Sequence, residues 1–167
     1  MYRADRRAGQ LAGVRSALYS RGMTGIDVDE IVLAAIVDER GRVLVQPRTG
    51  DAALAGTWEL PGGKILPAED HAAALVREVE EETGVAIRVG ALAVALCHAY
   101  ADRRVALYAY LCEPLAAGRP PRWTRWASPE EYRAMPMPEA NGAIVDGIED
   151  ALGAALADRA VEGLDTR

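Results

Sequence analysis

The sequence predicts one mixed α/β domain. Its 167 residues match the length of a typical single domain, roughly 100 to 200 residues. Half of the residues, 50%, are hydrophobic, which is enough to fill one core. Strand-like and helix-like segments alternate along the chain, and no internal repeat or low-complexity linker divides it. We therefore expect a single domain over residues 25–167, preceded by a basic helical extension over residues 1–24.

The extension carries five arginines against a single acidic residue, Asp5. Leu11, Val14 and Leu18 follow the spacing of one helix face. We expect a short amphipathic segment that packs on the domain or is poorly ordered. A partner-binding or oligomerisation arm is the alternative.

The segment EIVLAAIVDERGRVLVQPR, residues 30–48, predicts a β-hairpin. Its first arm is apolar on both faces, as expected of a central strand. Asp38–Gly41 would form the turn, and the β-branched return arm through Val43 and Val45 would end at Pro47.

A short strand and a helix are predicted next. Trp58 and Leu60 lie on a strand-like segment that the turn Pro61–Gly63 would terminate. Asp70 is placed as a helix N-cap, and Gly84 is placed as the matching C-cap.

The second half of the chain predicts three strands and two helices. The strands are expected over residues 86–101, 103–114 and 124–127. Ser128 and Pro129 predict a helix start, since Pro is favoured at the first helical position. A final helix is expected from Ala143 to about Val161.

Charge and hydropathy exclude several classes of partner. A net charge of −6 and a pI near 5.0 argue against binding a nucleic acid polymer, which requires clustered Lys and Arg. Binding of a small anionic substrate is still compatible with this charge if a bound metal ion mediates it. No run approaches the roughly 20 apolar residues of a membrane span, and no secretory signal is evident, so we expect a cytoplasmic protein. The protein could form an oligomer, but no sequence feature supports one.

Three glutamates predict a cation site. Glu78, Glu81 and Glu82 are related as i, i+3 and i+4, so a helix would present their carboxylates on one face. Like charges at these spacings destabilise a helix, and Arg77 alone cannot neutralise all three. Hard divalent cations such as Mg2+ prefer oxygen ligands and often share them with substrate phosphates. The alternative is a solvated acidic face.

The spacing from Gly63 to Val85 resembles the Nudix motif, G-x5-E-x7-R-E-U-x-E-E-x-G-U, where U is aliphatic. Within 23 residues, all nine constrained positions match: Gly63, Glu69, Arg77, Glu78, Val79, Glu81, Glu82, Gly84 and Val85. The resemblance implies the Nudix fold, a mixed β-sheet sandwiched between helices. It also implies Mg2+- or Mn2+-dependent hydrolysis of a nucleoside diphosphate linked to another moiety.

The resemblance assigns roles to the motif residues. The implied metal ligands are the carbonyl of Gly62 and the carboxylates of Glu78, Glu81 and Glu82. Arg77 would orient the carboxylates, and Glu69 would brace the junction between loop and helix. No acidic residue lies between Glu113 and Glu130, where several relatives carry a further ligand or base. The general base is therefore expected within the motif, with Glu81 first and Glu78 second.

The likeness extends to MutT-type enzymes over roughly residues 30–150. These enzymes convert oxidised dGTP to the monophosphate and pyrophosphate. Arg48, Glu59 and Asn141 fall at their substrate-contacting positions, and Asn141 would hydrogen-bond the base because an amide offers a donor and an acceptor. Lys64, the only lysine in the chain, is a further candidate to hold phosphate or sugar.

Three functions follow from these residues. The first is a MutT-type nucleoside triphosphate pyrophosphohydrolase acting on an oxidised dNTP such as 8-oxo-dGTP or on a pyrimidine dNTP. The second is an ADP-ribose, NADH or dinucleotide pyrophosphatase. The third is a non-catalytic Nudix-fold module that binds a nucleotide for regulation. Such modules commonly lose the motif glutamates, all of which this chain keeps.

Overall fold

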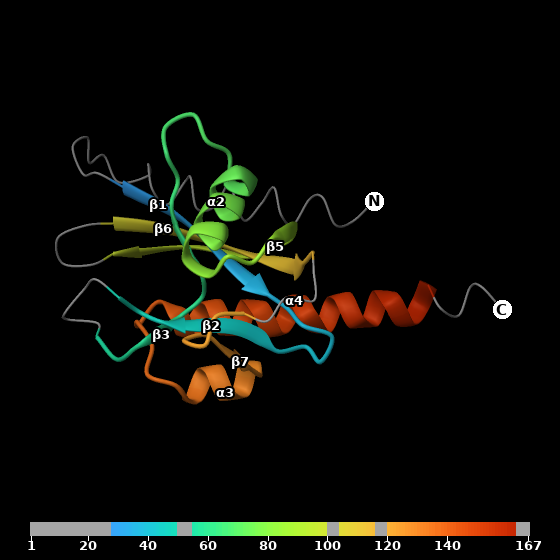
Figure 1. The fold of residues 1–167 in the computed structure, drawn as a ribbon. Coiled ribbons are helices and arrows are strands. Elements are labelled where there is room, and N and C mark those ends of the chain that lie inside the picture. Colours follow the sequence, from blue (N-terminus) through green and yellow to red (C-terminus); the bar gives the residue numbers. More distant parts are fainter. Residues whose placement is uncertain (1–27, 50–54, 100–103, 116–119, 163–167) are drawn as a thin grey trace.

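The computed structural model describes residues 28–49, 55–99, 104–115 and 120–162 (Figure 1). Its strands are β1 (Val28–Ile36), β2 (Val43–Pro47), β3 (Trp58–Glu59), β4 (Gly62–Lys64), β5 (Ile87–Ala99), β6 (Arg104–Pro114) and β7 (Arg125–Ala127). Its helices are α2 (His71–Thr83), α3 (Pro129–Ala134) and α4 (Asn141–Glu162). The predicted extension over residues 1–24 lies outside the described residues. None of the described helices combines the length and the apolar character that crossing a membrane requires.

The strands form two sheets. The larger sheet has the order β4-β1-β6-β5, and the smaller has the order β3-β2-β7. β1 runs parallel to β6 and antiparallel to β4, while β5 runs antiparallel to β6. The larger sheet is therefore mixed, with β1 as a central strand, as the sequence predicts.

The predicted hairpin between β1 and β2 is wrong beyond its turn. The turn forms where expected: the Gly41 N–H donates to the Asp38 carbonyl at 3.0 Å, and the Asp38 N–H donates to the Arg42 carbonyl at 2.9 Å. After the single bridge between Val37 and Val43, however, the two arms enter different sheets. β4 and β6 already occupy both edges of β1, so no edge is left for β2.

The segment predicted as a terminating turn, Pro61–Gly63, also contributes to a strand. Gly62 and Gly63 open β4, which pairs with β1 in the register Leu33↔Gly62. Gly62 has a φ of 149°, and a Cβ at this position would collide with the Val32 carbonyl. Only glycine permits this approach of β4 to β1.

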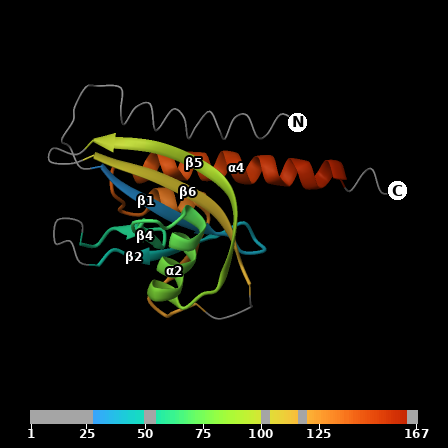
Figure 2. The same cartoon turned by 90° about the horizontal axis from the view of Figure 1, so that it is seen from above.

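Two hydrophobic clusters lie on opposite faces of the larger sheet, and α2 and α4 cover them (Figures 1 and 2). The cluster under α2 includes Val32, Ala34, Ile36, Leu75, Val79 and Tyr108. The cluster under α4 includes Leu33, Ala35, Leu107, Ile144, Val145 and Ile148. Successive β1 residues thus alternate between the two faces, as the strand repeat requires. The mixed sheet sandwiched between helices is confirmed.

The helix ends follow the predicted local signals. The Asp70 side chain accepts a hydrogen bond from the Ala73 N–H, and Gly84 closes α2 in the left-handed conformation with φ 64°. Ser128 and Glu131 form a capping box at the start of α3. The last helix begins at Asn141, slightly before the predicted Ala143.

Candidate active site

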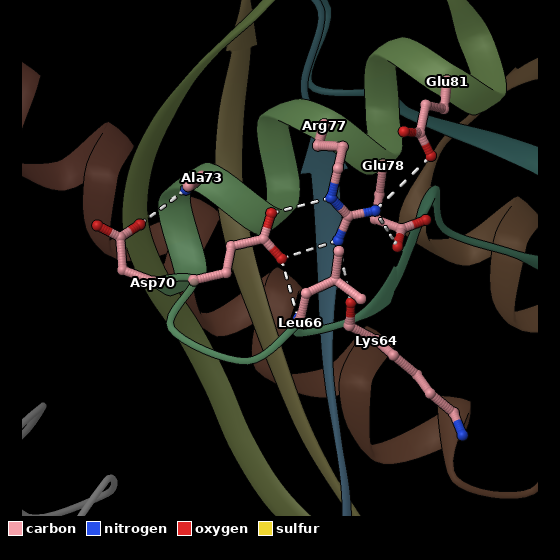
Figure 3. A network of polar contacts seen from close by, with 8 residues as sticks. Lys64, Leu66, Asp70, Ala73, Arg77, Glu78 and Glu81 are labelled. Atoms are coloured by element: carbon pink, nitrogen blue, oxygen red, sulfur yellow. Dashed lines mark hydrogen bonds and ion pairs between the residues drawn. The ribbon is translucent and has the colours of Figure 1, made fainter.

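The guanidinium of Arg77 organises the start of the site (Figure 3). It donates to Glu69 through Nε at 2.9 Å and through Nη2 at 2.8 Å, and to the Lys64 carbonyl at 3.1 Å. Hydrogen bonds from Arg77 and from the Leu66 N–H lower the pKa of Glu69 to about 2. Arg77 thereby ties the loop before α2 to the helix itself.

Arg77 also fixes Glu78. Its Nη1 donates to Glu78 Oε1 at 2.7 Å. On the other side, the Glu78 carboxylate lies against Gly63 so closely that a Cβ at Gly63 would overlap it. Glu78 is therefore held between its own helix and strand β4.

Glu82 is partly buried, unlike the exposed Glu81. Its Oε2 accepts hydrogen bonds from Gln46 Nε2 at 2.7 Å and from the Gly62 N–H at 3.0 Å. Burial raises the pKa of Glu82, and the negative charges of Glu59 and Glu78 raise it further against these two hydrogen bonds. The two hydrogen bonds therefore do not fully compensate the negative charge of the Glu82 carboxylate.

Glu81 differs from its neighbours in exposure. Its side chain is 63% exposed, and its nearest ionic partner is Arg77 at 3.6 Å. It lines an open depression along α2 together with Val76, Glu80 and other α2 residues. That depression holds none of the predicted substrate-binding residues.

The donor chemistry fits a hard divalent cation, while the present spacing does not yet form a chelate. Glu78, Glu81, Glu82 and the Gly62 carbonyl supply only oxygen atoms, which Mg2+ and Mn2+ accept. The charge shortage at Glu82 is what a cation would relieve. Among the described residues, however, no three His, Cys, Asp or Glu side chains lie close enough together to hold a metal ion. A cation held by this set would therefore draw the carboxylate oxygens closer together than they lie here.

A cavity of about 250 Å³ opens beside the Gly62–Gly63 segment. It gathers all four predicted substrate-binding residues, which come from separate parts of the chain: Arg48, Glu59, Lys64 and Asn141. Its remaining lining is Asp29, Thr49, Gly62, Gly63, Pro138 and the apolar residues Ile31, Leu33, Val105 and Leu107. Polar groups that converge beside an apolar wall are typical of a small-molecule site.

Arg48 and Glu59 form an ion pair on this wall, through Arg48 Nη1 and Glu59 Oε2. Burial raises the pKa of Glu59, and the charge of Arg48 opposes that effect. The Arg48 Nε is buried and lacks a hydrogen-bond partner among the described residues. Within the described part of the chain this donor has no acceptor, and such groups are rare in folded proteins.

Lys64 and Asn141 close the cavity from two other elements. Lys64 Nζ forms an ion pair with Asp29 at 2.8 Å, and its side chain extends away from Arg77 (Figure 3). Asn141 begins α4, is only 7% exposed, and donates from Nδ2 to the Tyr132 hydroxyl at 3.0 Å. Both side chains are therefore already positioned by a protein partner.

Two polar residues of the site escaped prediction. Gln46, 6% exposed, interrupts the apolar strand β2 and reaches Glu82. Tyr132, on α3, is fully buried and reaches Asn141. A polar side chain inside the apolar run VLVQP is the one sequence signal that could have revealed Gln46. Tyr132 gives no such signal, because a buried tyrosine reads as ordinary core.

Comparison with known proteins relates this chain to one family. A sequence model of the NUDIX domain matches residues 32–147. The CTP pyrophosphohydrolase of Escherichia coli is 32% identical over 113 residues, covering 66% of this chain and 84% of the relative. The 8-oxo-dGTP diphosphatase of the same organism is 31% identical over 106 residues, covering 64% of this chain and 80% of the relative.

Solved structures show the same relationship. The solution structure of the E. coli ORF135 protein aligns with a TM-score of 0.66 at 32% identity, covering 80% of this chain and 97% of that chain. The crystal structure of a MutT NUDIX hydrolase from Burkholderia pseudomallei aligns with a TM-score of 0.64 at 27% identity, covering 72% and 98% of the two chains.

Proposed function

The chain belongs to the NUDIX domain family of pyrophosphohydrolases, and from this premise we propose that it hydrolyses a nucleoside triphosphate to the monophosphate and pyrophosphate. The substrates proposed first are an oxidised dNTP such as 8-oxo-dGTP and a cytidine nucleotide, because relatives named for these two activities match the chain. The observation that carries the proposal is the cavity that joins Arg48, Glu59 and Asn141 next to Gly62 and Gly63.

The size of the cavity indicates how a nucleotide would lie. Its volume of about 250 Å³ is below the roughly 300–1,000 Å³ of pockets that enclose a whole drug-sized ligand. We therefore place only the nucleoside inside it, with the phosphates extending past Gly63 toward Glu78 and Glu81. The Arg48 Nε, which has no acceptor among the described residues, would donate to an oxygen of the substrate.

The divalent cation would be held by Glu78, Glu81, Glu82 and the Gly62 carbonyl. Bound there, it would neutralise phosphate charge and acidify water. The protein's own contribution is orientation: Arg77 holds Glu78, and Gln46 together with the Gly62 N–H holds Glu82. The hydrogen bonds from Gln46 and from the Gly62 N–H both end on Oε2 of Glu82. Oε1 is therefore the oxygen that would face a cation.

We assign proton removal from the attacking water to Glu81, with Glu78 second. Glu78 accepts a hydrogen bond from Arg77 at 2.7 Å. Glu81 is exposed, and its distance of 3.6 Å from the same guanidinium is longer than a hydrogen bond. An exposed carboxylate with a weaker partner is the one free to accept a proton. A correctly placed general base contributes roughly 10²- to 10⁴-fold to the rate.

A product assay tests the proposal. The purified protein is incubated with Mg2+ and CTP, dCTP, 8-oxo-dGTP, ADP-ribose or NADH, and the products are separated. Monophosphate plus pyrophosphate from a triphosphate supports the proposal. Cleavage confined to ADP-ribose or NADH would replace it with the second function, and nucleotide binding without turnover would replace it with the regulatory module.

A matched pair of variants tests the base. Glu81→Gln should lower kcat by roughly 10²- to 10⁴-fold without changing the thermal midpoint by more than a few degrees. Glu80→Gln is the control, because Glu80 is an exposed neighbour outside the constrained motif positions and should leave kcat within about twofold, as surface changes usually do. Equal rates for both variants would remove Glu81 from the mechanism.

A further inference from the structure

The charged side chains that line the cavity form two ion pairs. Arg48 pairs with Glu59, and Lys64 Nζ pairs with Asp29 Oδ1 at 2.8 Å. Among the described residues these four carry all the formal charges of the lining, so the lining as a whole is neutral. Carboxylates inside the cavity would repel phosphates. The lining therefore suits a neutral nucleoside, with the phosphates outside.

Asp29 lies at one end of the cavity. It shares one face of β1 with Ile31 and Leu33, because alternate residues of a strand point to the same side, and all three line the cavity. Ile31 is paired with Lys64 and Leu33 with Gly62 on β4. Along β1, Asp29 is about 13 Å from Leu33, at about 3.4 Å per residue. Asp29 therefore marks the end of the cavity beyond Lys64, away from Gly62.

Asn141, the residue proposed to bond the base, lies nearer the other end. Its amide is hydrogen-bonded to the Tyr132 hydroxyl at 3.0 Å, and the same hydroxyl is hydrogen-bonded to the backbone of Leu60. Leu60 lies just before Gly62 in the chain. Asn141 is thereby tied to the Gly62 end of β4, and Asp29 lies at the opposite end.

A nucleoside with its base beside Asn141 would turn its sugar hydroxyls toward Asp29. The base is attached to C1′ of the sugar and the phosphates to C5′, so the 2′ and 3′ positions form an edge that faces away from the base. The phosphates would leave past Gly63, where β4 is the edge strand of the larger sheet. The hydroxyl edge then meets the end of the cavity that Asp29 occupies.

We infer that Asp29 determines sugar specificity: its carboxylate accepts a hydrogen bond from the 2′-hydroxyl, so the site prefers a ribonucleotide to the deoxyribonucleotide of the same base. A carboxylate can accept about four hydrogen bonds, so the pair with Lys64 leaves capacity for a hydroxyl. Acidic side chains bind ribose hydroxyls in this way in dinucleotide-binding folds. The inference rests on the proposed function and adds the class of sugar, which ranks CTP ahead of dCTP.

The experiment compares kcat/KM for CTP with dCTP and for GTP with dGTP. Hydrogen bonds to charged groups are among the stronger ones, so the ribonucleotide should be favoured by at least about fivefold in each pair that the protein cleaves. The triphosphate of cytosine arabinoside, whose 2′-hydroxyl lies on the opposite face of the sugar, should behave as dCTP does. Equal rates for the two sugars, or a preference for the deoxy sugar, overturn the inference whether or not any variant folds.

Three variants separate a bond to the sugar from the pairing with Lys64. Asp29→Ala should bring the ribo-to-deoxy ratio to within about twofold of one, whereas Asp29→Asn keeps an acceptor oxygen and should retain part of the preference. Lys64→Met breaks the same ion pair from its other member, and it should lower kcat/KM for both sugars while keeping the ratio. If Asp29→Ala also keeps the ratio, Asp29 serves only to hold Lys64 and the inference falls.

Glu30→Gln is the matched control on the same strand. Glu30 follows Asp29 on β1 and points to the opposite face, where it accepts a hydrogen bond from the Tyr108 hydroxyl at 3.1 Å. This variant should keep the ribo-to-deoxy ratio of the unaltered protein. A ratio that falls equally in Glu30→Gln and Asp29→Ala would show damage to β1 rather than loss of a sugar contact, and it would also overturn the inference.

Binding of monophosphates distinguishes this inference from the proposed function. Calorimetric titration with CMP and dCMP measures the sugar preference without turnover. Hydrolysis of triphosphates with no ribose preference would sink the inference and leave the function standing. A ribose preference in binding that Asp29→Ala removes, in a protein that cleaves no triphosphate, would do the reverse.

Discussion

Arg77 and Glu69 are joined by two parallel hydrogen bonds, from Nε to Oε1 and from Nη2 to Oε2. The same guanidinium reaches Glu78 and the Lys64 carbonyl. A planar fork of donors serves this geometry, whereas the point charge of a lysine does not. The helix that carries the glutamates is thereby held to the loop that leads into it.

Arg77→Lys should therefore lower kcat/KM by roughly 10- to 100-fold, the usual cost of losing a group that orients metal ligands. Steady-state kinetics across Mg2+ concentrations would measure the loss. Arg133→Lys is the control, since Arg133 also donates to two carboxylates, Asp146 and Glu149, away from the cavity. Comparable losses in both variants would show that the effect is not local to the site.

His71 should make stability depend on pH. Its Nδ1 lies 2.8 Å from the Tyr110 hydroxyl and its ring packs on Tyr108. Burial lowers the pKa of His71 below 6.5, and the charges of Glu30 and Asp70 only partly oppose this. The unfolded chain then binds the proton more readily, so the free energy of unfolding falls as the pH drops through about 6.5 toward the folded pKa.

Thermal unfolding between pH 7.5 and 5.5 measures how steeply the stability changes with pH. His71→Gln should make this pH dependence weaker. An unchanged slope in His71→Gln would assign the pH dependence to other groups.

Gly63→Ala should impair activity more than stability. The added Cβ would overlap the Glu78 carboxylate, and this end of a flexible side chain can move aside at little cost to the fold. We expect the unfolding free energy to change by less than about 1 kcal/mol and kcat/KM to fall by roughly 10- to 100-fold. Parallel denaturation and kinetics check both values, and an active Gly63→Ala enzyme would contradict the close packing of Glu78 on β4.

Two glycines of α4 should respond in opposite directions. A Cβ on Gly147 would lie 2.6 Å from the Val94 Cβ, whereas a Cβ on Gly153 would meet no described residue within 4 Å. Gly153→Ala should stabilise by about 0.5–1 kcal/mol through helix propensity. Gly147→Ala should be destabilising, because overpacking costs about 1–3 kcal/mol. Urea denaturation of both variants tests the sign, and stabilisation by both would show that β5 yields to α4.

Features that depend on near neighbours were predictable from sequence. Asp70, Gly84 and Ser128 act on backbone groups within four residues, so their types and spacing were enough to locate the helix ends. The pairing of β1 was not predictable in the same way. Its hairpin signal was real at the turn, but β6, far along the chain, occupied the edge that β2 would have needed.

The same distinction between near and distant sequence neighbours applies to the candidate site. Glu69, Arg77 and Glu78 follow a fixed spacing and meet as that spacing implies. Gln46 acts on Glu82, 36 positions away, and Tyr132 acts through a single hydroxyl that looks like core in the sequence. Such contacts are set by which strands and helices become neighbours, and a local pattern does not contain that information.

Both sheets line the cavity, and among the described residues the bridge between Val37, just after β1, and Val43, at the start of β2, links the two strands. Leu33 and Leu107 belong to the larger sheet, whereas Glu59 belongs to the smaller one. An occupant that touches all three would act as a crosslink across this seam. The backbone amide of Asp38, which donates to the Arg42 carbonyl beside this bridge at 2.9 Å, should then exchange with deuterated water more slowly in the presence of nucleotide, which would make a bond far from any phosphate a reporter of occupancy.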